Sequence, residues 1–600
     1  MTTQKIINNF TIKIATTNGT GSQSANNILF KSLVRMGIAT SAKNLFPSNI
    51  QGLPTWFHIR TNPKGYQSMK RFSEILVAMN PTSSGQDLGE VKEGSVVIYD
   101  STVISVGQEK PGVTYYAAPM SRLAKDNFDT PRLRTLLTNT IYLGIISFLF
   151  GVDKKIIYEV VQDTFKKKQK VVDVNLKAIE LGYEYAKGNL TKKDSYFYEP
   201  DNKFQNKIII EGNQASALGC IFGGCTVAAW YPITPASSFS ETLDAYAKRF
   251  REDPATKKRK MAIVQAEDEI AAIGMAIGAG WAGARSVTGT SGPGISLMNE
   301  FIGLAYYAEI PIVICNVQRV GPSTGLPTRT QQADIIKCIF ASHGDAKHIV
   351  LLPGTVEEIY ELTAWAFDIA ERIQTPVMVL TDLELGMNLW ASDPFKYYDK
   401  PFDRGKILTA KDLEKIKEWG RYADVDKDGI PYRTLPGNPH PLAPYFTRGT
   451  GHTPEAGYSE DPAVYQANMH RLSKKYKTAV NYLPKPLISG DKKAKFGIIT
   501  VGTTHHAVVE ALDTLKDKNH FSIKYLRVLA YPFHEDIKTF VTECDKVLVV
   551  EQNRDGQLMS LLRMDLDGPL CPKLVSFAYS DGLPLDPDFI THKAREVFAS

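Results

Sequence analysis

The sequence predicts an α/β protein built from several doubly wound, mostly parallel sheets, and three observations support this fold class. Apolar runs of strand length, such as FTIKIATT (10–17) and PIVICNV (311–317), alternate with stretches of helical periodicity. Such alternation is typical of parallel strands covered by helices on both faces. Glycine-rich turns follow several of these runs, and 600 residues suffice for about three or four domains.

Composition and charge exclude several classes of protein. Hydrophobic residues make up 43% and charged residues 22%, which excludes a disordered or collagen-like chain. The net charge of +6 is small for this length and does not indicate nucleic-acid binding. The N-terminus lacks an apolar signal segment, and the longest apolar run, 270–284, is too short to span a bilayer. We therefore expect a soluble, cytoplasmic protein that binds neither nucleic acid nor membrane.

The six cysteines are scattered and form none of the short CxxC clusters that zinc or iron–sulfur ligation requires. They do not resemble a disulfide framework either, and several lie in apolar strings, where a buried thiol is expected. If the protein performs redox chemistry, its metal centre must lie on another chain.

Strand and helix patterns divide the chain into five parts. The first α/β part, 1–195, opens with FTIKIATT, a glycine turn and a helix, and further strands are expected at 74–79 and 95–99 with a helix near 131–148. Its lysine-rich end reads as a solvated linker, with a basic docking surface as the alternative. The remaining parts are a linker at 196–207, a second α/β part at 208–392, an irregular segment at 393–494 and a last α/β part at 495–600.

The irregular segment contains an acidic stretch, DVDKDG, that imitates the first half of an EF-hand loop. The twelfth position of such a loop, which needs a bidentate glutamate, is Leu435. The stretch therefore predicts a tight acidic turn.

Two loops of the second α/β part follow strands and contain chemically capable side chains. In YPITPASS (231–238) two prolines stiffen the loop around Thr234, although a turn before a serine-capped helix looks the same. In VQAEDEI (264–270) the helix dipole favours all three acids at a helix start. Glu267 comes first, directly after the apolar strand, where it could be buried and share a proton with a heterocyclic nitrogen. The residues alone leave both interpretations open.

A third loop, GTSGPGISLMNE (289–300), places glycines between a strand and a helix. It lacks the Lys-Ser/Thr ending of a P-loop and the spacing of GxGxxG. A close backbone approach to another ligand or to a neighbouring subunit is an equal alternative to a phosphate site.

Taken in order with NVQRVGPSTGLPTRTQQAD (316–334), these three segments resemble the α subunit of the 2-oxoacid:ferredoxin oxidoreductases. The likeness is greatest to the 2-oxoglutarate enzymes in which a γ domain is fused ahead of α, and it extends over nearly the whole chain. LVAMNP and VKEGSVVIYDS resemble the γ domain. The resemblance continues towards the C-terminus in PYRTLPG, RGTGH and EQNRDGQL. One departure is the first glycine turn, NGTGSQS, where γ domains usually have a GxGGQG-like run, so its role is undetermined.

The resemblance implies a thiamine diphosphate enzyme whose cofactor is shared between two chains. Residues 208–392 would form the pyrimidine-binding domain, and 495–600 a domain like the C-terminal domain of transketolase. Glu267 aligns with the family's activating carboxylate, which binds the pyrimidine nitrogen and so promotes deprotonation of the thiazolium ring. Tyr231, Pro232 and Ile233 would line the cofactor.

The resemblance also implies how a 2-oxoacid substrate is bound. Thr234 would offer its hydroxyl to the substrate carboxylate. Arg319 is expected to bind that carboxylate, since a guanidinium pairs with it bidentately. Arg329 is a second candidate, especially for the distal carboxylate of a dicarboxylic acid.

The family's reaction needs parts that this sequence lacks, and these imply partners. The GDG…N signature for Mg²⁺ and diphosphate is absent, as is a cysteine set for a 4Fe–4S cluster. In this family both belong to a β subunit, so we expect an (αβ)2 heterotetramer that takes coenzyme A as co-substrate and passes electrons to ferredoxin. Pyruvate or branched-chain 2-oxoacids are alternatives to 2-oxoglutarate, and a non-catalytic binding or scaffold protein is the contrasting class. The sequence leaves the direction of flux and the coenzyme A site open.

Overall fold

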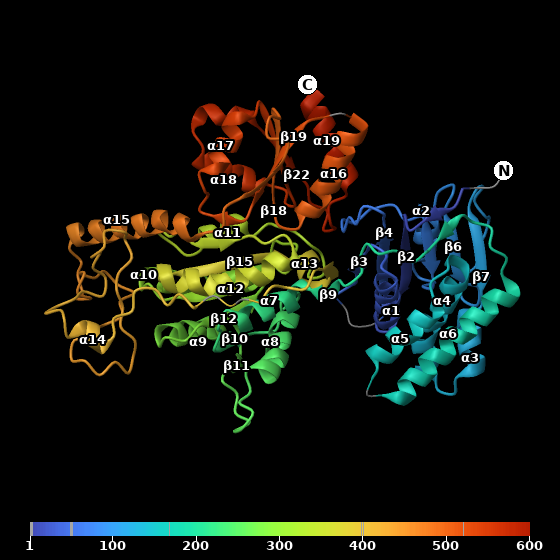
Figure 1. Cartoon of the computed structure of the whole chain (residues 1–600), viewed down its shortest axis with the longest axis horizontal. Coiled ribbons are helices and arrows are strands. Elements are labelled where there is room, and N and C mark those ends of the chain that lie inside the picture. The colour runs from blue at the N-terminus through green and yellow to red at the C-terminus, as the bar shows by residue number, and fades with distance from the viewer. Residues whose placement is uncertain are drawn as a thin grey trace. The chain divides into compact units, whose positions relative to one another are not determined.

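The computed structural model describes residues 4–48, 52–166, 168–397, 399, 401–519 and 521–599. The chain divides into two compact units, one formed by residues 1–210 with 388–394, and the other by 211–387 with 395–600. Each unit contains mostly parallel sheets with helices on their faces, which confirms the predicted fold class (Figure 1). Each is described by itself below.

The first unit is built on a six-stranded sheet in the order β3-β4-β2-β5-β6-β7. Strands β2, β5, β6 and β7 are parallel, whereas β4 runs antiparallel to both β2 and β3. Two further pairs, β1 with β8 and β9 with β16, lie outside this sheet. The strands are β1 Ile6–Ile7, β2 Phe10–Thr17, β3 Thr40–Leu45, β4 Pro54–Thr61, β5 Ile75–Ala78, β6 Val96–Asp100, β7 Thr114–Ala118, β8 Tyr196–Phe197, β9 Ile208–Glu211 and β16 Leu389–Ser392.

One face of this sheet is covered by a layer of long helices and the other by α2. Within the layer, α4 and α6 touch at two glycines: a Cβ on Gly144 would lie 2.0 Å from the carbonyl oxygen of Ile179, and one on Gly182 equally close to that of Ile141. Residues 169–189 of the lysine-rich tract, which spans 166–207, thus form a packed helix and not a linker. The helices are α1 Ser22–Arg35, α2 Ser84–Glu90, α3 Met120–Asn127, α4 Pro131–Phe150, α5 Lys154–Thr164 and α6 Gln169–Asn189.

Among the described residues, α4 is the one helix long and apolar enough to cross a membrane by length and composition. In the structure 67% of its apolar window is buried, as expected for a core helix. The longest apolar run in the sequence is 270–284 instead, because arginine, threonine and asparagine side chains interrupt the apolar run of α4.

The second unit contains a seven-stranded sheet in the order β11-β10-β12-β13-β15-β14-β20. All neighbours are parallel except β14 and β20, which are antiparallel. Along β13, Ile312 and Ile314 face one layer of helices while Val313 and Cys315 face the other. The strands are β10 Val227–Trp230, β11 Ala262–Gln265, β12 Ser286–Thr290, β13 Ile312–Gln318, β14 Ile349–Leu351, β15 Pro376–Asp382 and β20 Ala530–Tyr531.

Two helical layers cover this sheet. One consists of α7, α8 and α12, and the other of α9, α10 and α11. The helices are α7 Gly212–Phe222, α8 Ser237–Phe250, α9 Glu269–Trp281, α10 Gly292–Tyr307, α11 Ile335–Ile339, α12 Val356–Ile373 and α13 Leu383–Met387.

The end of the chain forms a five-stranded sheet in the order β17-β19-β18-β21-β22, parallel except for β17. Its core is continuous with that of the larger sheet, because Val501, Leu526 and Leu558 pack in one cluster with Ile335 and Leu352. The strands are β17 Leu487–Gly490, β18 Phe496–Val501, β19 Ile523–Val528, β21 Lys546–Glu551 and β22 Leu574–Ala578, and the helices are α16 Thr504–Asn519, α17 Asp536–Glu543, α18 Gln557–Asp565 and α19 Pro587–Ala599.

Between the two sheets the chain is irregular apart from α14 Ala410–Leu413, α15 Pro462–Ala479 and a short 3-10 turn. The predicted acidic turn is confirmed. Asp426 and Asp428 lie 2.7 and 2.8 Å from the ammonium group of Lys406, and Asp424 accepts the backbone N–H of Gly429. Five of the six cysteines are buried, as expected, and Cys571 is partly exposed.

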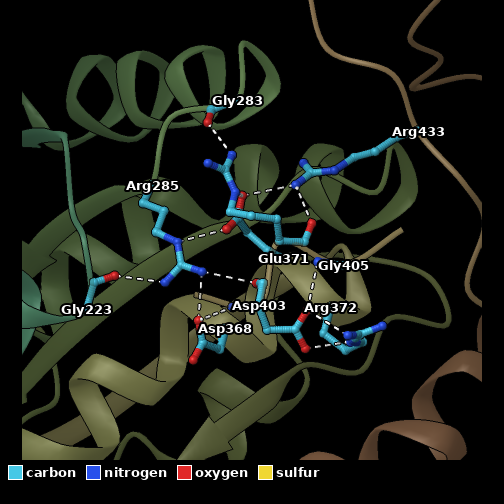
Figure 2. A network of polar contacts seen from close by, with 10 residues as sticks. Gly223, Gly283, Arg285, Asp368, Glu371, Arg372, Asp403, Gly405 and Arg433 are labelled. Atoms are coloured by element: carbon cyan, nitrogen blue, oxygen red, sulfur yellow. Dashed lines mark hydrogen bonds and ion pairs between the residues drawn. The ribbon is translucent and has the colours of Figure 1, made fainter. Parts of the chain in front are cut away.

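A buried ionic network fastens the irregular segment to α12 (Figure 2). Glu371 of α12 accepts hydrogen bonds from Arg285, Arg404 and Arg433, at 2.8, 2.8 and 3.1 Å. Arg285 also pairs with Asp368 at 2.7 Å and donates to the carbonyl oxygen of Gly223. One carboxylate on α12 therefore joins the residue that precedes β12 to two separate points of the irregular segment.

Candidate functional site

The sequence motifs meet at one edge of the seven-stranded sheet. Strands β11, β10, β12 and β13 are parallel neighbours, so their carboxyl ends lie side by side. The loops that follow them hold Glu267, Thr234, the Gly292–Gly294 turn and Arg319 respectively. In open α/β sheets this edge is where ligands bind.

Thr234 and Arg319 are in direct contact. The Nη1 atom of Arg319 donates a hydrogen bond to the backbone oxygen of Thr234 at 2.7 Å. Arg319 is only 8% exposed, and its Nε is buried with no partner in the described residues. Burial lowers the pKa of Arg319, while the nearby carboxylates of Asp334 and Glu269 oppose that shift. The guanidinium therefore retains unused hydrogen-bonding capacity beside the 231–235 loop.

The acidic triplet at the end of β11 has three different environments. Asp268 caps α9 by accepting the backbone N–H of Ala271 at 2.7 Å, which confirms its expected helix-start role. Glu269, in the first helical turn, is buried, whereas Glu267 is exposed. Of the two interpretations that the sequence left open, burial of Glu267 is therefore not found in this chain alone. The reason is that β11 is an edge strand, so the apolar run before Glu267 is not enclosed by its own sheet.

Apolar side chains near Glu267 are also exposed. Val264 on β11 is 41% exposed, and Ile270 and Met275 on α9 are 42% and 46% exposed. Tyr231 and Pro232 of the neighbouring loop are exposed as well, while Ile233 is half-buried. Clustered apolar exposure of this kind marks a surface that another molecule covers.

The glycine loop is required by packing within the chain. A Cβ on Gly294 would lie 1.9 Å from Thr290 Oγ1 and 2.9 Å from Glu269 Cγ. A Cβ on Gly292 would lie 2.7 Å from a carboxylate oxygen of Asp334. The glycines thus let α10 approach the buried Glu269 and the half-buried Asp334.

Arg329 belongs to the same loop as Arg319 but has other neighbours. The backbone N–H of Val320 donates to the Arg329 carbonyl oxygen at 3.1 Å. The segment that contains Arg319 therefore lies next to the segment that contains Arg329. The Arg329 guanidinium donates to the backbone oxygen of Thr328, and a Cβ on Gly582 would lie 3.1 Å from its Cβ. Burial lowers the pKa of Arg329.

Sequence reasoning missed one half-buried acid of the site, Asp334. Its carboxylate accepts a hydrogen bond from the amide of Asn316 at 3.0 Å, and burial raises its pKa. Its backbone N–H donates to Gln318 at 2.9 Å. The one feature of the sequence that could have indicated Asp334 is its position as the last residue of the 316–334 motif.

Family models match both units of the chain. The model described as pyruvate flavodoxin/ferredoxin oxidoreductase, thiamine diphosphate-binding, matches residues 218–400. The model described as pyruvate ferredoxin/flavodoxin oxidoreductase matches residues 11–185.

Relatives and solved structures agree with these models. The α subunit of 2-oxoacid:ferredoxin oxidoreductase 2 from Aeropyrum pernix is 31% identical over 91% of each chain. The 2-oxoglutarate synthase subunit KorA of Methanocaldococcus jannaschii is 34% identical over 57% of this chain and 88% of its own length. The structure of 2-oxoglutarate:ferredoxin oxidoreductase from Magnetococcus marinus, with 2-oxoglutarate, coenzyme A and succinyl-CoA bound, superposes with a TM-score of 0.87 at 30% identity, covering 98% of this chain and 99% of that one. The chain belongs to the family of 2-oxoacid:ferredoxin oxidoreductase α subunits.

Proposed function

We propose that this chain is the γ-fused α subunit of a 2-oxoglutarate:ferredoxin oxidoreductase, which converts 2-oxoglutarate and coenzyme A to succinyl-CoA and carbon dioxide with electrons passed to ferredoxin. The observation that carries the proposal is the contact between Arg319 and Thr234, at the sheet edge where Glu267 also lies. The likeness along almost the full chain to a 2-oxoglutarate enzyme supports the choice of substrate.

The residues present fit half of a thiamine diphosphate site. Glu267 is accessible beside exposed apolar side chains, a combination that suits the edge and face of a pyrimidine ring. When bound, thiamine diphosphate supplies the carbon that attacks a 2-oxoacid and the electron sink for decarboxylation. Glu267 would hold a proton at the ring nitrogen, and Tyr231, Pro232 and Ile233 would pack against the ring.

Substrate binding would use the two loops that touch. Arg319 would bind the 2-oxoacid carboxylate, because its buried Nε lacks a partner among the described residues and a guanidinium binds a carboxylate bidentately. Thr234 would donate its hydroxyl to the same carboxylate. Arg329, on the neighbouring segment of the same loop, would bind the distal carboxylate of 2-oxoglutarate.

A second chain would complete the site. The sequence has no GDG…N signature and no clustered cysteines, so Mg²⁺, the diphosphate and the 4Fe–4S cluster would be held by a β subunit in an (αβ)2 assembly. The exposed apolar side chains of β11 and α9 support this, because a partner would cover them and bury Glu267. The division into domains at 195, 207, 392 and 494, and a cytoplasmic location, remain predictions.

The experiment is a substrate panel on the complex with the β subunit, thiamine diphosphate, Mg²⁺, coenzyme A and a low-potential dye. We expect dye reduction with 2-oxoglutarate and little with pyruvate or a branched-chain 2-oxoacid. Several relatives are named for 2-oxoacids in general, so equal rates would favour a broad-specificity enzyme. No reduction with any 2-oxoacid would contradict the proposal and favour a scaffold protein.

Two variants test the selectivity. Arg329→Gln should lower the preference for 2-oxoglutarate over pyruvate by about tenfold, because a charge-assisted hydrogen bond is lost. Arg554→Gln, at an exposed arginine in the loop between β21 and α18, is the matched control and should leave the preference unchanged.

A further inference from the structure

The loop that carries Arg319 and Arg329 ends against the C-terminal sheet. It leaves β13 at Gln318 and runs to α11, which packs against α18 (Figure 1). Residues 321–326 are exposed, whereas Thr328 and residues 330–332 are buried and Ala333 is half-buried. The exposed tip of the loop is therefore anchored at one end.

Hydrogen bonds across this junction reach each residue from Thr330 to Ala333. The backbone N–H of Thr330 donates to Gly582, the side chain of Gln331 to Ser580, and the backbone N–H of Gln332 to Gln552. The side chains of Asn553 and Gln557 donate to the backbone oxygens of Gln332 and Ala333, at 3.0 and 2.6 Å. All these partners belong to the segments that follow β21 and β22.

Gln557 makes two bonds at the point where the loop becomes a helix. Besides its bond to Ala333, its Oε1 accepts the backbone N–H of Ile336 at 3.1 Å. Its two bonds lie on either side of Asp334, whose backbone N–H donates to the side chain of Gln318 at 2.9 Å. Because Gln318 directly precedes Arg319, a shift of this turn would be passed to Arg319.

The donor segment is itself held rigidly. Glu551 is fully buried and accepts bonds from the Asn553 side chain and from the backbone N–H groups of Leu558 and Met559, at 2.6, 2.7 and 3.0 Å. Asn553 in turn accepts the backbone N–H of Gln557. These bonds fix the first turn of α18, and with it the orientation of the Asn553 and Gln557 side chains that contact the loop.

We propose that Asn553 and Gln557 are positioning residues, which act from the C-terminal sheet to fix the Arg319 loop and so set the affinity for the 2-oxoacid carboxylate. The inference rests on the proposed function for its substrate. The contacts themselves lie within one compact unit of this chain. They give a function to the EQNRDGQL segment, whose sequence shows only a resemblance to the family.

The test uses Gln557→Met in the complex with the β subunit. Methionine keeps the length of the side chain and removes both hydrogen bonds to the loop. We expect the KM for 2-oxoglutarate to rise about tenfold, as for the loss of two hydrogen bonds, with little change in kcat or in the KM for thiamine diphosphate. Gln557→Glu, which keeps the acceptor for Ile336 but faces the Ala333 oxygen with a carboxylate, should raise the KM as well.

Ser560→Ala is the matched control, because Ser560 bonds to Gly556 in the same helix and does not touch the loop. A KM in Gln557→Met within about twofold of that control would overturn the proposal. Amide hydrogen exchange of residues 319–334 provides a readout that is independent of turnover. Exchange there should be faster in Gln557→Met than in Ser560→Ala, and equal rates would refute the positioning role. If the wild-type complex turns over no 2-oxoacid, the proposed function fails, and the exchange result alone decides the positioning claim.

Discussion

The buried network around Glu371 should carry a large share of the stability of its unit, and Glu371→Gln tests this. The substitution keeps the volume of the side chain and removes its charge. Arg285 and Arg433 then lose the carboxylate that both contact (Figure 2). Their side chains are only 2% and 3% exposed, so water cannot replace it.

The magnitude follows from burial. Breaking a buried ion pair by removing one partner costs about 3–5 kcal/mol, because the remaining charge is left uncompensated. Glutamine can still accept part of the hydrogen bonding, and Asp368 still neutralises one side of Arg285, so we expect the lower end, about 3 kcal/mol. This is a large fraction of the 5–15 kcal/mol typical of a folded protein.

Equilibrium denaturation by urea, followed by tryptophan fluorescence and by circular dichroism, measures the change. The control is Glu361→Gln, at an exposed glutamate of the same helix, which should leave the midpoint unchanged. If Glu371→Gln shifts the midpoint no more than Glu361→Gln does, the network does not stabilise the fold and the reasoning is refuted.

Three further predictions concern the site and the pH dependence. Glu267→Gln should leave the complex assembled, as judged by gel filtration, and remove most of its turnover; retained activity would exclude Glu267 as the activating acid. Arg319→Ala should raise the KM for 2-oxoglutarate more than that for thiamine diphosphate, and the reverse pattern would point to Arg329 as the ligand of that carboxylate. Burial lowers the pKa of His348 from 6.5 to about 4, so the unfolded chain binds more protons between these values and stability should fall as pH drops through that window. His348→Leu should reduce this fall by up to about 1.4 kcal/mol per pH unit, measured by urea denaturation, and an unchanged slope would contradict the assignment.

The sequence predicted an element correctly where its structure depends only on residues that are close together in the chain. FGIITVG became β18 because a continuous apolar run suits a strand buried on both faces. Asp268 became a helix cap because its position directly before the helix lets its side chain accept a free backbone N–H. The glycine turn at 292–294 opened α10 as expected.

Features that depend on distant parts of the chain could not be predicted in this way. Glu267 is exposed because β11 lies at the edge of its sheet. The order of the strands in a sheet cannot be predicted from the residues of one strand. Arg285, Glu371 and Arg433 each look like ordinary surface charges, and only the fold brings them together. The bonds between Gln557 and the Arg319 loop join residues more than two hundred positions apart.

The central claim is that Glu267 completes a cofactor site only when a second chain covers it. Amide hydrogen exchange of residues 264–270 tests this most directly, measured in the chain alone, with the β subunit, and with the β subunit plus thiamine diphosphate and Mg²⁺. The account predicts slower exchange when the β subunit binds and slower exchange again when the cofactor is added. Exchange that stays at the rate of the isolated chain in all three samples would contradict it.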